Sequence, residues 1–411
     1  MCGIVGYVGA QQAAPILLEG LQKLEYRGYD SAGIAVLDGS TIELAKACGE
    51  IKNLLAKTHD GSDLHGYIGL GHTRWATHGA PTEANAHPHV SNDGKFAIVQ
   101  NGIIENFMEL REMLQAKGFR FHSETDTEVI VHLLDMYYTG DGNLKDTVMK
   151  TLGRLEGSYA IGILCADCPE QMFLARNGCP LIIGVGAGEN FFASDVTALV
   201  SHTKNVVYLD DGELAEVRAD SYTVFDCTGK PIEKPVSRVA WDIEAAEKGG
   251  YEHFMLKEIM EQPRAIKSTL DPRVKDHRVV FDELKMTDAQ LMGFNKIMIT
   301  ACGSAFYAGQ AGKYALEKLT HIPVDADLAS EFRYRDPIVD EHTLMIIISQ
   351  SGETADTIAA IREAQSKGAY VLSIVNVVGS TIARISDDVI YTWAGPEIAV
   401  ATTKGYTTQV S

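Results

Sequence analysis

The sequence has few basic residues for its length, and it has no long apolar run. Lysine and arginine number 36 against 55 aspartates and glutamates, so the formal net charge is −19. A protein with this charge repels nucleic acid phosphates and anionic lipid headgroups. Apolar runs such as residues 344–348 are far shorter than the ~18 residues of a membrane-spanning helix. We therefore expect no nucleic acid partner and no membrane partner.

Cysteine is scarce, and its number is odd. The seven cysteines are Cys2, Cys48, Cys165, Cys168, Cys179, Cys227 and Cys302. An odd number scattered over 411 residues is typical of reduced thiols and not of a disulfide framework. The first residues also lack the basic segment and apolar stretch of a signal peptide. We expect a cytoplasmic protein.

Motifs for metals and common cofactors are absent or incomplete. Gly184, Gly186 and Gly188 match part of a dinucleotide fingerprint, but no clear crossover helix follows, so we expect a turn there. Cys165 and Cys168 lack a second pair of zinc ligands nearby. No phosphate-binding loop of the nucleoside triphosphatases occurs. We predict no metal and no cofactor.

The pattern of apolar residues changes near residue 240. The first part has short strand-like runs, such as residues 96–100 and 160–165, and helical periods at residues 13–24 and 106–117. These features predict an α+β domain with much antiparallel sheet. Residues 236–250 then turn polar and end in two glycines, which is typical of a boundary.

After this boundary, strand-like runs alternate with helical ones. A helix is expected at residues 253–262, ending at Pro263. The strand-like runs are residues 296–300, 323–326, 344–348, 370–375 and 389–392. Such an alternation predicts a parallel, doubly wound sheet.

Cys2 is a candidate nucleophile because of its position. Removal of Met1 would place its α-amine beside its own thiol, and an amine with a pKa near ~7.7–8.0 can accept the thiol proton. The alternative is a small buried hydrophobic residue. An acyl-transfer nucleophile needs donors for an oxyanion, and Asn101 and Gly102 offer an amide and a backbone N–H. The alternative for this pair is a hairpin turn.

Two further segments carry polar side chains for a zwitterionic substrate. In the first, residues 72–79, the Arg74 guanidinium can hold a carboxylate bidentately. The second, residues 123–128, is acidic and includes Asp126. Its alternative is a capping box that opens a helix at residues 129–137.

Five segments together resemble the class II glutamine amidotransferase domain of the N-terminal-nucleophile hydrolases. They are residues 1–9, 24–33, 72–79, 101–102 and 123–128. The resemblance implies an αββα sandwich in which Cys2 attacks the glutamine carboxamide and forms a thioester. By the same matching, Asn101 and Gly102 form the oxyanion hole. The remaining implied roles are glutamine binding by Arg74, Thr77, His78 and Asp126, loop ordering by Arg27, and gating of ammonia passage by Trp75.

In the second part, two expected strand-to-helix junctions carry small hydroxyl residues. One contains Ser304 and the other contains Ser349, Ser351 and Thr354. Hydroxyls and free N–H groups at helix N-termini favour phosphate. The alternative is ordinary helix capping. The two loops, together with residues 402–404, favour phosphate binding.

These junctions resemble a sugar isomerase (SIS) domain with a flavodoxin-like α/β fold. With the first part, they resemble the glutamine–fructose-6-phosphate aminotransferase family over essentially the whole chain. That family makes glucosamine 6-phosphate, the first step toward UDP-N-acetylglucosamine. The resemblance implies that the sugar phosphate is held by Ser304, Ser349, Gln350, Ser351 and Thr354. Ala305 stands where relatives commonly carry a second hydroxyl.

The expected organisation is a glutaminase domain at residues 2–238, a linker and helical lead-in at 239–290, and an incomplete first SIS domain at 291–411. The second SIS domain of the family is absent, so we expect a truncated chain that hydrolyses glutamine and binds sugar phosphate but makes no aminosugar alone. Relatives suggest a homodimer. Two alternatives stay open: another class II amidotransferase, such as the phosphoribosylamine-forming enzyme, and a non-catalytic sugar phosphate sensor.

Overall fold

Two sheets packed face to face form the centre of the first unit, Met1–Ala240. The computed structural model describes residues 2–25, 28–76, 78–140, 143–239 and 248–411. The first sheet has the strand order β15 (Ser237–Arg238), β11 (Asn205–Tyr208), β9 (Ile182–Val185), β10 (Asn190–Ala193), β1 (Gly3–Val8), β4 (Ile68–Arg74), β2 (Ser31–Asp38) and β3 (Thr41–Cys48). The second has the order β14 (Pro231–Ile232), β13 (Tyr222–Phe225), β12 (Leu214–Arg218), β8 (Gln171–Asn177), β7 (Gly157–Cys165), β6 (Phe96–Ile104) and β5 (His89–Val90).

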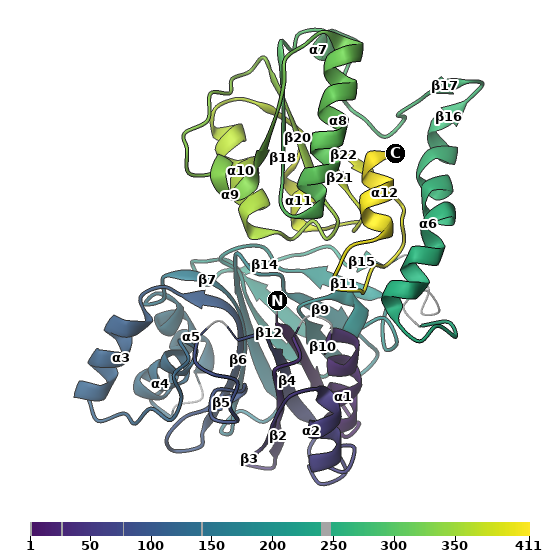
Figure 1. Cartoon of the computed structure of the whole chain (residues 1–411). Helices are drawn as coiled ribbons and strands as arrows, with labels where there is room; N and C mark the ends of the chain where they lie inside the picture. The colour runs from purple at the N-terminus through teal and green to yellow at the C-terminus, as the bar shows by residue number, and fades with distance from the viewer. Residues whose placement is uncertain (1, 26–27, 77, 141–142, 240–247) are drawn as a thin grey trace. The chain divides into compact units, whose positions relative to one another are not determined.

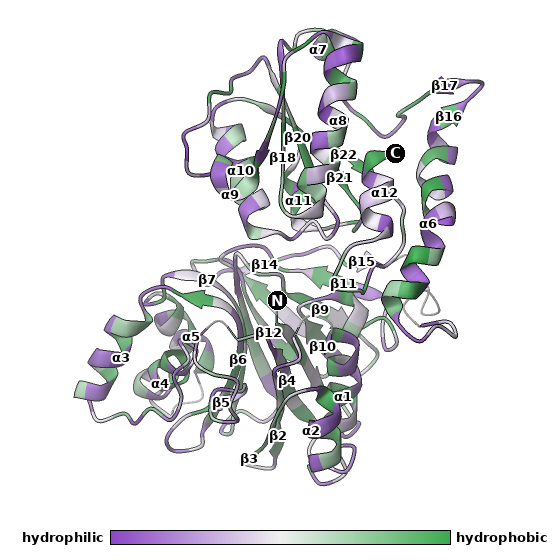
Figure 2. Ribbon diagram, in the orientation of Figure 1, coloured by the Kyte–Doolittle hydropathy of each residue, from purple (hydrophilic) through white to green (hydrophobic). Residues whose placement is uncertain are grey.

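Helices cover the outer faces of both sheets (Figure 1). On the first sheet lie α1 (Ala13–Leu24) and α2 (Ile51–Lys57), and on the second lie α3 (Phe107–Ala116), α4 (Glu128–Tyr137) and α5 (Leu144–Leu152). In Figure 2, β6 and β7 carry green stretches, while α3 and α4 alternate between green and purple, as helices with one buried face do. The αββα sandwich is confirmed. Gly184 lies in β9, and Gly186 and Gly188 lie in the turn that joins β9 to β10, so the expected turn is also confirmed.

The second unit, Trp241–Ser411, contains a five-stranded parallel sheet. Its order is β19 (Val324–Leu328), β18 (Lys296–Ala301), β20 (Thr343–Ser349), β21 (Tyr370–Val375) and β22 (Asp388–Tyr391). One face packs on α8 (Ser304–Thr320) and the other on α9 (Ala329–Phe332), α10 (Ala355–Ser366) and α11 (Thr381–Ile385). This 2-1-3-4-5 order is that of a flavodoxin-like sheet, which confirms the predicted class. The shorter elements are η2 (Val196–Ala198), η4 (Asp271–Arg273), β16 (Val274–Lys275), β17 (Arg278–Val279), α7 (Asp288–Leu291) and α12 (Lys404–Val410).

One helix prediction was wrong. Helix α6 runs over Phe254–Leu270 and passes through Pro263. A proline cannot donate to the carbonyl four residues earlier, here that of Ile259. The Gln262 side-chain amide donates to this carbonyl at 3.1 Å instead. A side chain therefore replaces the missing backbone bond, and the helix continues.

Phe192 fills the space between the two sheets of the first unit. It is fully buried on β10, opposite Gly6 of β1. A Cβ on Gly6 would lie 1.7 Å from the Phe192 ring, and a Cβ on Gly162 of β7 would lie 2.6 Å from it. Both sheets therefore provide glycine where the ring packs.

We predict that Gly162→Ala lowers the free energy of unfolding by about 1–3 kcal/mol, because the new methyl group overpacks the core. Thermal or urea unfolding of the full chain measures it. Gly312→Ala is the matched control, since an added Cβ there meets no atom within 4 Å and alanine is favoured in a helix by about 0.5–1 kcal/mol. Equal changes of the same sign in the free energy of unfolding of both variants would contradict the tight packing of Phe192 against Gly162.

Candidate functional site

Cys2 lies immediately before β1, and its thiol rests against the backbone that follows β4. Pairing of Gly3 with Thr73 sets this position. The Trp75 N–H donates to Cys2 Sγ at 3.2 Å, and the Trp75 carbonyl lies 3.5 Å from the same sulfur. Burial raises the pKa of the Cys2 thiol, although the Trp75 N–H opposes the shift. The resting group is therefore a neutral thiol that needs a base.

Asn101 and Gly102 lie inside a strand, so both the expected strand end and the alternative of a hairpin turn were wrong. Strand β6 continues to Ile104 because β7 pairs with it throughout, with Gly102 opposite Tyr159. Gly102 has φ +110°, and a Cβ there would lie 2.1 Å from the Ser158 carbonyl oxygen. Only glycine fits this position. Asn101 Nδ2 donates to the Cys2 carbonyl at 3.1 Å, which brings the predicted oxyanion donor to the predicted nucleophile.

The Arg74 guanidinium is buried and holds the loop that follows it. It donates to the carbonyls of Gly79 at 3.2 Å, Ala80 at 3.3 Å and His78. Three of its five N–H groups are thereby used within the protein. Thr77 lies outside the described residues. Arg74 thus orders the segment that carries His78.

Asp126 lies beside the end of β6. Its carboxylate accepts the Ile104 N–H at 2.8 Å, two residues beyond Gly102. Burial raises the pKa of Asp126, although the hydrogen bond from the Ile104 N–H opposes the shift. The His78 ring packs against Phe107, with centroids 5.4 Å apart. The alternative for this segment, a capping box, is not present: the α4 N-cap, Thr127, makes no side-chain cap bond.

Trp75 is 45% exposed and meets Tyr29 edge-to-face at 5.2 Å. The next residue, Ala76, donates its N–H to the Asp30 carboxylate. Arg27 lies outside the described residues. The structure therefore brings Asn101 into contact with Cys2. Arg74 directly precedes Trp75, whose N–H contacts the Cys2 thiol, and Asp126 binds the backbone two residues beyond Gly102.

A group of buried histidines behind Asn101 was not predicted as part of the site. His72 Nε2 lies 3.1 Å from Asn101 Oδ1, and His87 Nδ1 lies 3.2 Å from His72 Nε2. Thr127 Oγ1 lies 2.9 Å from His87 Nε2. These contacts join residues far apart in the sequence, so no local pattern marks them.

The predicted sugar phosphate residues lie on two neighbouring loops of the second unit. Strands β18 and β20 pair in parallel, so Ser349, the last residue of β20, lies at the same edge of the sheet as the loop from β18 to Ser304. Ser304 begins α8 after Gly303, and Thr354 precedes α10 without a side-chain cap bond. The alternative of ordinary capping by these hydroxyls was therefore wrong. Ser349 Oγ accepts the Gly352 N–H at 3.0 Å, which shapes the loop.

Gln350 and Ser380 have unused hydrogen-bonding groups at this loop. Both amide atoms of Gln350 and the hydroxyl of Ser380 are buried without a hydrogen-bond partner among the residues that the structure describes. A Cβ on Gly352 would lie 2.0 Å from Ser380 Oγ, so Ser380 lies against the loop. Ser380 was missed because it follows a different strand, β21. Buried groups without partners are costly unless a ligand or water satisfies them.

Residues 402–404 do not support phosphate binding, contrary to expectation. The Thr402 hydroxyl donates to Glu397 at 2.7 Å, and the Thr403 N–H donates to the same carboxylate at 2.8 Å. Lys404 is buried, and its Nζ pairs with Glu261 at 2.6 Å. These polar groups are occupied within the second unit.

Known proteins resemble both units. A glutamine amidotransferase domain matches residues 43–239, and a SIS domain matches residues 290–411. Glutamine–fructose-6-phosphate aminotransferase (isomerizing) of Caldanaerobacter subterraneus subsp. tengcongensis is 56% identical over 100% of this chain and 67% of its own length. The chain belongs to the glutamine–fructose-6-phosphate aminotransferase family. The Clostridium tetani member is 53% identical over the same shares.

One solved structure shares the fold at lower identity. Glutamine phosphoribosylpyrophosphate amidotransferase from B. subtilis, complexed with ADP and GMP, is 19% identical with a TM-score of 0.50. The alignment covers 95% of this chain and 90% of that one. No helix among the described residues has the length and apolarity that a bilayer crossing requires.

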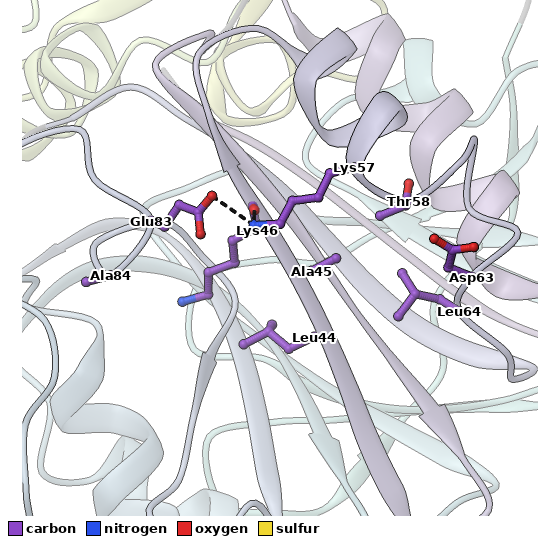
Figure 3. A pocket seen from close by; sticks show the side chains of 9 residues that line it. All are labelled: Leu44, Ala45, Lys46, Lys57, Thr58, Asp63, Leu64, Glu83 and Ala84. Atoms are coloured by element: carbon purple, nitrogen blue, oxygen red, sulfur yellow. Dashed lines mark hydrogen bonds and ion pairs between the residues drawn. The ribbon is translucent and has the colours of Figure 1, made fainter.

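A separate pocket of about 510 Å³ lies beside β3, away from the predicted site residues of this aminotransferase family member. Figure 3 shows its lining residues: Leu44, Ala45, Lys46, Lys57, Thr58, Asp63, Leu64, Glu83 and Ala84. Lys57 Nζ pairs with Glu83 at 2.8 Å. Burial lowers the pKa of Lys46 to about 8, although Glu128 and Glu83 oppose the shift.

We predict that Lys46 is acetylated faster than Lys52 when the native chain is treated with limiting acetic anhydride at pH 8.5. With a pKa of about 8, about three-quarters of Lys46 is neutral at this pH, against about one in eighty of an ordinary lysine. Lys52 is the control because its side chain is 71% exposed. Peptide mass spectrometry measures both rates, and slower labelling of Lys46 would contradict the lowered pKa.

Proposed function

We propose that this chain hydrolyses glutamine at Cys2 and binds fructose 6-phosphate in its second unit, as the two halves of a glucosamine 6-phosphate-forming reaction. The observation that carries the proposal is the contact between Asn101 Nδ2 and the backbone of Cys2, which is 3.1 Å long. It places an amide donor beside a thiol at the second position of the chain. The 411 residues span 67% of the length of the Caldanaerobacter relative. For this chain alone we therefore propose glutamine hydrolysis and sugar phosphate binding.

In the glutamine half-reaction, Cys2 Sγ attacks the carboxamide carbon while the α-amine exposed by removal of Met1 accepts the thiol proton. The carbonyl oxygen becomes an oxyanion, which Asn101 Nδ2 and the Gly102 N–H stabilise. The C–N bond then breaks, the α-ammonium returns the proton to the leaving nitrogen, and ammonia departs. Water hydrolyses the γ-glutamyl thioester to glutamate and regenerates the thiol.

The charged ends of glutamine would be held by the segments around Cys2. Arg74, Thr77 and His78 are proposed for the carboxylate, and Asp126 for the ammonium. The buried Arg74 supports this role by ordering the loop, since its guanidinium binds the carbonyls of residues 78–80. Arg27 is proposed to order a loop, and Trp75 to gate the passage of ammonia.

We predict that Cys2→Ala lowers the rate of glutamate release from glutamine by roughly a thousandfold or more, because it removes the nucleophile. A coupled glutamate assay on the full chain measures it. Cys227→Ala is the matched control, because Cys227 is an exposed cysteine that lies in none of the contacts of the glutamine site. Unchanged release from Cys2→Ala would refute the role of Cys2, and no release from the unaltered chain would favour a non-catalytic sensor.

The sugar phosphate is proposed to bind Ser304, Ser349, Gln350, Ser351 and Thr354. The support is the pair of adjacent loops at the ends of β18 and β20, with Gln350 unpartnered beside them. Helix N-termini and hydroxyls favour a phosphate dianion. We also propose that ammonia passes between the two sites and that the protein is a cytoplasmic homodimer.

We predict that Thr354→Val weakens binding of fructose 6-phosphate by about tenfold, the loss expected for one hydrogen bond to a charged group. Isothermal titration of the full chain measures it. Ser366→Ala is the control, since Ser366 Oγ donates to the Glu363 carbonyl at the end of α10. Equally tight binding of fructose without phosphate, or of phosphoribosyl pyrophosphate, would argue against this site.

A further inference from the structure

The buried histidine group behind Asn101 ends at two backbone carbonyls. His72 Nε2 lies 3.1 Å from the Gln100 carbonyl oxygen and 3.1 Å from Asn101 Oδ1. Asn101 Nδ2 in turn lies 3.1 Å from the Cys2 carbonyl oxygen. A backbone carbonyl can only accept a hydrogen bond. The carbonyls of Gln100 and Cys2 therefore determine which atoms of His72 and Asn101 donate hydrogen bonds.

The Gln100 carbonyl determines which nitrogen of His72 carries the proton. Because this oxygen can only accept, Nε2 of His72 has to donate. The proton on Nε2 also faces Asn101, so Asn101 presents its oxygen to His72. The amide nitrogen is then directed to the Cys2 carbonyl, where one N–H is used and the other is left over.

His87 adds a third acceptor beside His72. The Thr127 hydroxyl donates to Gln100 Oε1 at 2.6 Å, so its oxygen accepts the Nε2–H of His87 at 2.9 Å. His87 Nδ1 then carries a lone pair, and it lies 3.2 Å from both His72 Nε2 and His72 Nδ1. It accepts from whichever His72 nitrogen is protonated, so the Gln100 carbonyl is the contact that selects Nε2.

Burial keeps the His72 ring neutral. The side chain has 0% exposure, and desolvation lowers the pKa of His72 to about 3. A neutral imidazole has one N–H, and Nε2 holds it. Nδ1 of His72 therefore carries no proton and cannot donate a hydrogen bond.

We propose that His72 is a positioning residue for glutamine hydrolysis, which holds the Asn101 amide with its N–H toward Cys2 and its oxygen away. This inference rests on the proposed function of Cys2 and Asn101. A reversed Asn101 amide would direct a carbonyl oxygen at the forming oxyanion and would repel it. His72 never touches glutamine and acts only through Asn101.

A double-mutant cycle on the full chain tests the inference, with kcat and KM for glutamate release measured in each variant. We expect Asn101→Ala to lower kcat about 10²- to 10³-fold. His72→Leu should lower kcat about tenfold or more and change KM for glutamine less than about twofold, because only the transition-state interaction is lost. In the Asn101→Ala background, His72→Leu should change kcat less than about twofold.

His72→Gln is the matched variant, since its side-chain amide can still donate to Asn101. It should recover most of the kcat that His72→Leu loses. Equal losses from His72→Leu with and without Asn101 would overturn the inference and leave the proposed function intact. If Asn101→Ala itself leaves kcat unchanged, the proposed oxyanion hole fails and the inference fails with it.

A second measurement does not depend on whether His72→Leu folds. In the full chain with ¹⁵N-labelled histidine, the His72 signals are identified by their loss in His72→Gln. We expect a protonated Nε2 and an unprotonated Nδ1 at neutral pH. A protonated Nδ1 with a bare Nε2 would overturn the inference.

Discussion

The hydrogen bonding of β1 between β4 and β10 is the constraint on which the proposed glutamine site depends. Gly3 pairs with Thr73, and Val5 pairs with both Gly71 and Ala193. A shift of one residue in such a ladder moves every side chain to the other face. The register therefore places Cys2 just outside the sheet, with its sulfur at the backbone of Trp75 and its carbonyl at Asn101. The strand register therefore makes the Cys2 thiol and the proposed oxyanion donor, Asn101, neighbours.

The two units build their sites in different ways. In the first, polar groups lie inside or directly beside antiparallel strands, and the sheet itself positions them: Gly102 is still paired with Tyr159 of β7. In the second, the candidate phosphate groups lie on loops at the carboxyl ends of parallel strands, where α/β sheets bind ligands. The first arrangement is fixed by the register of the sheet. In the second, the side chains of Gln350 and Ser380 are buried without a hydrogen-bond partner among the described residues.

Strongly periodic elements were predictable from the sequence, because their signal is local. The helical period at residues 13–24 coincides with α1, and the alternation of strands and helices after residue 290 gave the parallel sheet. The predictions that failed depended on distant partners. Asn101 and Gly102 have a strong turn propensity, yet pairing with β7 keeps them in a strand. A proline ends most helices, yet at Pro263 the helix continues because the Gln262 side chain supplies the missing hydrogen-bond donor.

The residues of the candidate site also differ in whether a local sequence signal marks them. Cys2 was recognisable by its place in the chain, and Asp126 by its acidic segment. His72 and Ser380 were not recognisable, because their roles come from contacts with residues far away in the sequence. Thr402 and Thr403 show the opposite error: their hydroxyl groups suggested phosphate, but both residues bind Glu397. The sequence alone does not show which polar side chains are hydrogen-bonded to each other within the fold.

The most direct test of the account is the location of the covalent bond that a glutamine-like diazoketone forms with the native chain. Peptide mass spectrometry after treatment should find one adduct, on the sulfur of a Cys2 that has become the N-terminal residue. Burial raises the pKa of neighbouring Cys179 to about 11, so this thiol should stay unmodified. An adduct on Cys179, or full glutamine hydrolysis by protein that retains Met1, would contradict the central claim.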